Sequence, residues 1–160
     1  VRPPELGTDT SLTVSVLKHQ FEVFERKNIK CASIILLQPT NPLRPKNLIE
    51  EGIRLIESHQ RNSLATFSIL DKKYGDIKNN IFSPINYVAG QRSQDIADNY
   101  FENGLLYISK KKAVMDGYVI TPDVFPLVMN HIYGTVDIDL ESDLQYAEFL
   151  INRENNGTIY

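Results

Sequence analysis

The sequence predicts an α/β fold in which a doubly wound, mostly parallel sheet carries helices on both faces. A continuously apolar run at residues 31–37 is typical of a central strand that is covered on both sides. Helical and strand patterns alternate along the chain, as they do in such folds. With 160 residues, of which 42% are hydrophobic, the chain is long enough for one core. We therefore expect a single domain over residues 1–160.

Three segments have the spacing of amphipathic helices. Residues 11–25 carry apolar side chains every three to four positions, and residues 45–58 begin with Pro45, which suits a first helical turn. Residues 141–153 form the last predicted helix. Its expected buried face consists of Leu140, Leu144, Ala147 and Ile151.

Four further segments are predicted to be extended. Residues 63–70 read as a strand, and residues 105–109 form another that an Asn-Gly turn introduces. Residues 116–125 form a shorter extended piece, stopped by Pro122. Residues 134–139 are expected to be a strand with Asp at alternate positions.

The segment from about residue 71 to 100 breaks this pattern. It is rich in Lys, Asn, Ser and Gly, with isolated apolar residues. A segment of this length inside a compact domain is usually a functional loop or an interface arm. We expect one of these two roles for it.

Composition excludes several classes of protein. The net charge is −3 and the 17 Lys and Arg residues are scattered, which argues against a nucleic-acid partner. No apolar run approaches the roughly 20 residues that span a bilayer, so we expect no membrane association. A single cysteine leaves no internal disulfide. These features predict a cytoplasmic protein.

A polar turn follows the first apolar strand. It contains Gln38, Thr40, Asn41 and Arg44 between prolines that stiffen it. A rigid turn loses little entropy when it orders around a ligand, and amides can donate to and accept from hydroxyl groups. The sequence is equally compatible with an ordinary proline-capped loop.

Asp137 and Asp139 flank Ile138, so in an extended segment both carboxylates point to one face. A hard divalent cation such as Mg²⁺ would relieve the repulsion between them through oxygen ligands. The alternative is that Asp139 or a neighbour caps the helix that follows.

Another polar group surrounds the strand at residues 105–109. Arg92 and Gln94 lie upstream of it, Asn103 precedes it and Tyr107 lies within it. Asn103 is also compatible with a plain turn residue, and Tyr107 with a core position.

Five motifs in order resemble those of the CMP-sialic acid synthetases, also called acylneuraminate cytidylyltransferases. They run from Arg2 to Glu148 and read "RPPELGTDTS", "ILLQPTNPLR", "RSQD", "NGLLYI" and "VDIDLESDLQYAE". The resemblance implies a Rossmann-like nucleotidyltransferase sheet. It also implies the transfer of CMP from CTP to a nonulosonic acid, which gives the CMP-sugar and pyrophosphate.

The same resemblance implies roles for individual residues. Asp137 and Asp139 match the family's magnesium ligands and are the expected catalytic residues, with Mg as cofactor. The first motif lies against the cytidine, which makes Gly7, Thr8 and Asp9 the expected nucleotide-binding residues. The expected substrate-binding residues are Gln38, Thr40, Asn41, Arg44, Arg92, Gln94, Asn103 and Tyr107. Arg92 is the candidate for the sugar's carboxylate by its charge, and Asn41 stands where the family usually has Ser.

The family is typically homodimeric through an excursion near residues 71–100, so we expect a homodimer. It also opens with a strand and a loop that grips the CTP phosphates, and this sequence begins after that loop. We therefore expect the N-terminal part of the fold to be missing, and these 160 residues alone to be inert. Two alternatives are another sugar nucleotidyltransferase and a degenerate relative that dimerises without catalysis.

Overall fold

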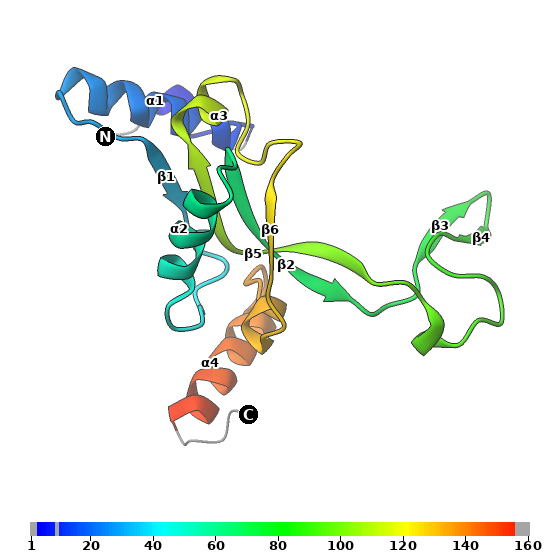
Figure 1. Cartoon of the computed structure of the whole chain (residues 1–160). Coiled ribbons are helices and arrows are strands. Elements are labelled where there is room, and N and C mark those ends of the chain that lie inside the picture. Colours follow the sequence, from blue (N-terminus) through cyan, green and yellow to red (C-terminus); the bar gives the residue numbers. More distant parts are fainter. Residues whose placement is uncertain (1–2, 9, 156–160) are drawn as a thin grey trace.

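The computed structural model describes residues 3–8 and 10–155 of the chain. Within these residues a four-stranded sheet has the strand order β1-β5-β2-β6 (Figure 1). Its strands are β1 Ser33–Leu36, β2 Ser63–Leu70, β5 Asn99–Lys110 and β6 Phe125–Val128. The helices are α1 Thr13–Arg26, α2 Leu48–Ser58, α3 Lys111–Met115 and α4 Glu141–Asn155, with 3₁₀ turns η1 Pro4–Leu6, η2 Ser93–Asp95 and η3 Ile132–Thr135.

The predicted fold class is confirmed, with one strand reversed. Strands β1, β2 and β6 run in the same direction, and β5 lies antiparallel between β1 and β2. The helices lie on both faces of the sheet. Ile34 packs with Leu17 and Phe21 of α1, whereas its neighbour Ile35 pairs with Ile108, which lies on the α2 side. Successive residues of a strand point to opposite faces, so α1 and α2 cover opposite faces.

Helix α2 approaches the sheet closely at a glycine. A Cβ added to Gly52 would lie 2.7 Å from a methyl carbon of Leu106 and 3.0 Å from one of Ile108. This contact belongs to the main core, which is completed by Leu48, Ile56, Leu64, Leu105, Leu127, Tyr133, Val136, Ala147 and Leu150. The core therefore joins α2 and the sheet to η3 and α4.

Two predicted strands are wrong. Residues 116–124 turn without pairing, and the strand of this region is β6, which begins only at Phe125. Residues 134–139 also form no strand, because η3 ends at Thr135 and residues 136–139 are irregular. Their backbone bonds instead to a turn, since Ile138 N donates to Thr40 O at 2.8 Å.

Strand β5 is longer than predicted, and its Asn-Gly pair makes a bulge rather than a turn. Tyr107 pairs with Ala65 of β2, whereas Glu102 pairs with Phe67, so the extra residues of β5 bulge out between the two pairs. Thr66 fills the gap, because its Oγ1 accepts a hydrogen bond from Leu106 N at 3.0 Å. The bulge places Asn103 and Gly104 inside the strand.

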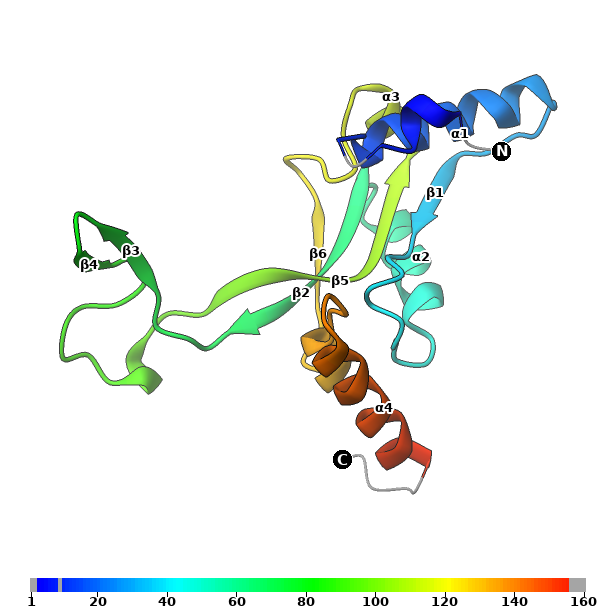
Figure 2. The ribbon, with the colours of Figure 1, turned by 180° about the vertical axis from the view of Figure 1, so that it is seen from behind.

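Residues 71–98 form an arm that extends from one side of the sheet in both Figures 1 and 2. Its hairpin pairs β3 Gly75–Lys78 with β4 Ile81–Pro84. The turn residues Asn79 and Asn80 both have positive φ, as a tight two-residue hairpin requires. Several large apolar side chains of the arm are exposed, namely Ile77, Ile81, Phe82, Ile85 and Val88.

Helix α4 is confirmed, but its buried face differs from the predicted one. Ala147 and Leu150 are buried, whereas Leu144 and Ile151 are about two-fifths exposed. The helix rests on η3 along a narrow strip, and the Tyr133 hydroxyl donates a hydrogen bond to the Glu154 carboxylate near its end. Of the predicted face only Ala147 is buried, and Leu140, at 68% exposure, lies outside the contact as well.

No helix in the described ranges, residues 3–8 and 10–155, has the length and apolar character needed to cross a membrane. A cytoplasmic location stays a prediction.

The contact between Tyr133 and Glu154 predicts a pH dependence of stability. Burial, followed by the hydrogen bond to Glu154 and its charge, raises the pKa of Tyr133 to about 12. The stabilisation is therefore fully present below the ordinary tyrosine pKa of about 10 and is lost as the pH rises toward 12. Tyr133→Phe should lower the free energy of unfolding by about 1 kcal/mol at neutral pH and flatten the alkaline loss.

Urea unfolding of both proteins from pH 8 to 12 measures this difference. Tyr118→Phe, at an exposed tyrosine, is the matched control and should leave the profile unchanged. Burial and Glu102 also raise the pKa of Tyr107, so part of the alkaline loss remains in the Tyr133 variant. Parallel profiles for wild type and Tyr133→Phe would contradict the prediction.

Candidate active site

The turn after β1 is fastened to the sheet by Arg44. Its Nε donates to Leu105 O at 2.8 Å, and one terminal nitrogen donates to Gln38 O at 3.0 Å. Burial lowers the pKa of this guanidinium, which remains charged at neutral pH. The predicted rigid turn is therefore held by Arg44 as well as by its prolines.

Asn41 connects the same turn to the acidic segment. Its side chain is 3% exposed, and its Nδ2 donates to Val136 O at 2.5 Å. The bond from Ile138 N to Thr40 O makes a second link beside it. Two segments nearly a hundred residues apart are thereby joined, with Gln38 at one end and Asp137 at the other.

A pocket of about 350 Å³ opens where these segments meet the β5 bulge. It brings together five of the predicted site residues, Gln38, Asn41, Asn103, Tyr107 and Asp137. The remaining lining residues are Phe101, Glu102, Gly104, Gly134, Thr135 and Val136. The sequence did not single out these six. Glu102 and Gly104 flank Asn103 in the sequence, and this adjacency is the signal that could have pointed to them.

Gly104 forms part of the pocket wall, and any side chain there would be strained. Its φ is +74°, and an added Cβ would overlap Asn41 Oδ1 and lie 2.8 Å from Gln38 Oε1. The glycine therefore allows the backbone of β5 to approach two side-chain amides. This close approach gives the Asn-Gly pair its structural role.

The Asn103 amide is held on both sides. Its Nδ2 donates to Ser68 Oγ at 2.9 Å, and its Oδ1 accepts from Leu105 N at 3.2 Å. Ser68 Oγ in turn donates to Met129 O at 3.3 Å. Asn103 thus stabilises the bulge, and its role as a substrate contact stays a prediction.

The pocket is acidic. Burial raises the pKa of the Tyr107 hydroxyl, and so do Glu102, through its charge and a hydrogen bond, and the charge of Asp137. Tyr107 is therefore a neutral hydrogen-bond donor at physiological pH. None of the described residues that line the pocket is a Lys, Arg or His. Such a lining favours cations and hydroxyl groups over bare anions.

Asp137 and Asp139 are both exposed, while Ile138 packs against the core. The start of α4 is capped by Asp143, whose Oδ2 accepts from Asp139 N at 3.1 Å and from Leu140 N at 2.8 Å. The capping residue is therefore Asp143, a neighbour of Asp139, which agrees with the capping alternative. The Asp139 carboxylate itself takes no part in the cap.

The donor set matches the way in which Mg²⁺ binds. Over the described part of the chain, no three or more His, Cys, Asp or Glu side chains are grouped closely enough to hold a metal by themselves. Mg²⁺ is usually held by one or two carboxylates, with water and substrate phosphates as its other ligands. Asp137 could supply such a carboxylate from the pocket lining, whereas Asp139 is exposed and is not among the lining residues, so its part in a metal site stays a prediction.

The pocket lining does not include the other predicted residues that the structure describes, which are Thr40, Arg44, Asp139, Arg92, Gln94, Gly7 and Thr8. Arg92 is exposed in the arm and forms two hydrogen bonds with Asp95, at 2.8 and 2.9 Å, which raise the pKa of Arg92. Gln94 lines a small cavity at the base of the arm. Gly7 and Thr8 are exposed before α1, and Asp9 lies outside the described residues. The roles of these residues stay predictions.

A neighbouring cavity extends the site toward the arm. It has a volume of about 460 Å³ and shares Phe101 and Thr135 with the pocket. Its walls combine apolar side chains such as Met129 with polar ones such as His131 and Lys72. A ligand longer than the first pocket could continue into it.

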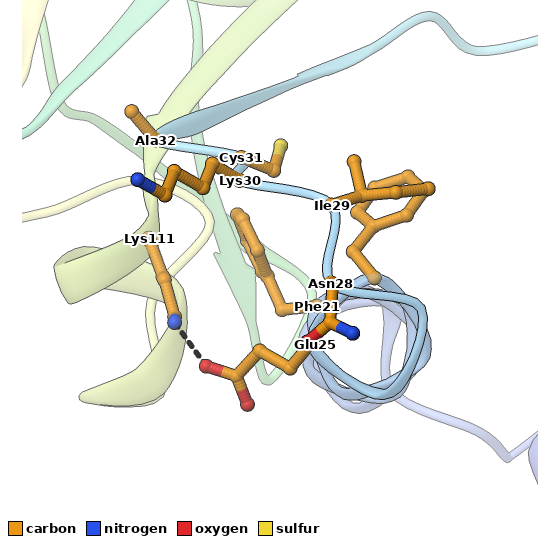
Figure 3. A pocket seen from close by; sticks show the side chains of 9 residues that line it. Phe21, Glu25, Asn28, Ile29, Lys30, Cys31, Ala32 and Lys111 are labelled. Atoms are coloured by element: carbon orange, nitrogen blue, oxygen red, sulfur yellow. Dashed lines mark hydrogen bonds and ion pairs between the residues drawn. The ribbon is translucent and has the colours of Figure 1, made fainter.

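A different cavity, of about 560 Å³, lies at the opposite end of β1 (Figure 3). Phe21 and Ile29 lie on its apolar side, and an ion pair between Lys111 and Glu25 lies on its other side. It contains none of the predicted site residues. The acidic pocket is therefore the candidate active site.

Comparisons with known proteins agree with the motifs. No family model matches the chain. Among curated proteins, an N-acylneuraminate cytidylyltransferase of Streptococcus agalactiae serotype III is 29% identical over 100% of this chain, which spans 40% of that relative. The CMP-N,N'-diacetyllegionaminic acid synthase of Legionella pneumophila is 27% identical over 99% of the chain and 71% of the relative.

A third relative is the pseudaminic acid cytidylyltransferase of Campylobacter jejuni, which is 26% identical over 97% of the chain and 70% of its own length. The three relatives thus match nearly the whole chain, although it spans well under half of the streptococcal protein. These matches agree with the resemblance that the motifs predicted: nearly the whole chain is similar to curated cytidylyltransferases and a CMP-sugar synthase whose names specify nonulosonic acids.

Proposed function

We propose that this protein is a nucleotidyltransferase that transfers CMP from CTP to the anomeric hydroxyl of a nonulosonic acid and releases pyrophosphate. The observation that carries the proposal is the acidic pocket in which the Gln38 turn and Asp137 meet. The names of the relatives support a cytidylyl transfer to a sugar acid of this class. The acceptor is a sialic-type acid, and which one is left to the binding test below.

In this proposal Asp137 and Asp139 hold Mg²⁺. The ion would neutralise negative charge on the α-phosphate of CTP and so make it accessible to attack. The protein's own carboxylates supply the negative site that attracts the ion, since Glu102 and Asp137 line one pocket. Transfer of CMP to a hydroxyl depends mainly on how the two substrates are positioned. The rigid turn after β1 and the bulged strand β5 can provide this positioning.

The amides and Tyr107 are proposed to bind the sugar. Gln38 can donate to and accept from hydroxyl groups, and the oxygen of Tyr107, whose proton is donated to Glu102, can accept from them. The sugar's carboxylate is repelled by Glu102 and Asp137, so it should lie away from the pocket floor. Arg92 stays the candidate for binding it by charge, although in the described chain it is paired with Asp95.

We further propose that the protein is a homodimer that pairs through the arm. The apolar side chains of the hairpin have nothing to cover them in the described chain; Ile77 is 73% exposed and Ile81 is 66% exposed. Exposed apolar groups gathered on one projecting element are typical of an interface. Such pairing is also compatible with the alternative of a relative that dimerises without catalysis.

Sugar binding is the direct test of the proposed function. Saturation-transfer NMR with N-acetylneuraminic, legionaminic and pseudaminic acids, in the presence of CTP and Mg²⁺, should detect binding of at least one of them. Binding is the primary readout because it tests recognition of the sugar without requiring turnover. If none binds while a neutral sugar or another nucleotide does, the protein is a different nucleotidyltransferase or no enzyme of this kind.

The metal assignment predicts a localised effect of Mn²⁺, a paramagnetic substitute for Mg²⁺. Amide NMR signals of residues 136–140 and of Tyr107 should broaden at substoichiometric Mn²⁺ and recover when Mg²⁺ is added. Asp137→Asn and Asp139→Asn should each weaken this effect about tenfold or more, because one of the two ligands is lost.

Asp76→Asn is the matched control, since Asp76 lies in the hairpin of the arm. It should leave the broadening of residues 136–140 unchanged. Broadening that persists in both active-site variants would show that the metal is held elsewhere.

The dimer proposal predicts a mass of about twice 18.3 kDa in light scattering after size exclusion. Ile77→Asp and Phe82→Asp place a charge on the apolar surface and should shift the protein to a monomer. Met115→Asp, at an exposed apolar residue of α3, is the control and should stay dimeric. A wild-type monomer at micromolar concentration would refute the proposal.

A further inference from the structure

We propose that Asn41 determines which sugar acid is accepted, because its Oδ1 accepts a hydrogen bond from a hydroxyl or amide N–H group of the substrate. The inference rests on the proposed function. It goes further by naming the chemical group that the substrate must place at Asn41 Oδ1, which is a hydroxyl or an amide N–H.

The orientation of the Asn41 amide is fixed by its partner. Val136 O can only accept, so the nitrogen of the amide must face it, and Nδ2 does so at 2.5 Å. The oxygen therefore points the other way. Asn41 Oδ1 is buried and has no hydrogen-bond partner in the described part of the chain.

The unpartnered oxygen lies against Gly104, which forms part of the pocket wall. A Cβ on Gly104 would overlap it, and Gln38 Oε1 lies beside the same point, so both side-chain oxygens face the bare backbone of Gly104. Asn41, Gln38 and Gly104 all line the pocket. Buried polar atoms are normally hydrogen-bonded, so an unpaired acceptor in a pocket indicates a donor on the ligand.

This geometry is selective in a way that the rest of the pocket is not. The Gln38 amide can present either its oxygen or its nitrogen, and Tyr107 can both donate and accept. At its unpartnered oxygen Asn41 can only accept, because the bond from its nitrogen to Val136 O fixes the orientation of the amide. A carboxylate or keto oxygen at this point would meet an acceptor without a proton between them. Hydroxyl and N–H groups are therefore selected.

Two roles of Asn41 must be separated in a test, since its Nδ2 also holds the acidic segment. Loss of that link would weaken the binding of every ligand by a similar factor. Loss of the Oδ1 contact would weaken only ligands that carry the matching donor. The experiment therefore varies the ligand together with the residue.

The affinity of the protein for N-acetylneuraminic acid and for a panel of its analogues is measured with CTP and Mg²⁺. In each analogue one hydroxyl is replaced by hydrogen, or the amide N–H is methylated. The variants are Asn41→Ser, which is too short to hold the oxygen in place, and Asn152→Ser on α4 as the matched control. Thermal unfolding confirms that each variant is folded.

One analogue should bind wild type about tenfold more weakly than the parent sugar, as expected for a lost hydrogen bond in a buried site. For that analogue Asn41→Ser should cause little further loss, whereas it should weaken the parent sugar about tenfold. Asn152→Ser should bind all ligands as wild type does.

The outcomes separate this inference from the proposed function. If wild type binds sugar acids but Asn41→Ser weakens every analogue equally, or none of them, Asn41 does not read a substrate donor and only this inference fails. If wild type binds no sugar acid, the proposed function itself fails together with it.

Discussion

The candidate site depends on the contact between the proline turn after β1 and the acidic segment after η3. Asn41 Nδ2 bonds to Val136 O, and Ile138 N bonds to Thr40 O. Neither segment belongs to a helix or strand at that point, so no regular ladder places one against the other. These two links, together with the anchoring of the turn by Arg44, decide where Gln38 and Asp137 lie relative to each other.

Most of the scaffold could be predicted from the sequence because it rests on periodicity. The apolar runs gave β1 and β2, and the helical spacing gave α1, α2 and α4. The reversed direction of β5 was not predictable, since an apolar run does not reveal the sense of a strand. The strand predicted at residues 134–139 was wrong. Alternating Asp and apolar residues are also compatible with an irregular backbone, which here forms a hydrogen bond with the turn after β1.

Only part of the site could be predicted from the sequence. Gln38, Asn103, Tyr107 and Asp137 stood out by residue type and by motif, and the fold brings them into one pocket. Phe101 and Thr135 carry no such signal, and they line the pocket only because of the β5 bulge and the η3 turn. The arm hairpin escaped prediction although its two Asn residues adopt the left-handed conformation that such turns require.

The glycine at position 104 has a consequence for how this pocket can change during evolution. Its backbone conformation and its contact with two amides leave no room for a side chain. A substitution at this one position of the wall would therefore displace the Asn41 and Gln38 amides. The exposed rim, where Phe101, Glu102 and Thr135 contribute side chains, is under no such constraint. A lineage could acquire a new acceptor sugar through rim substitutions without losing a folded protein.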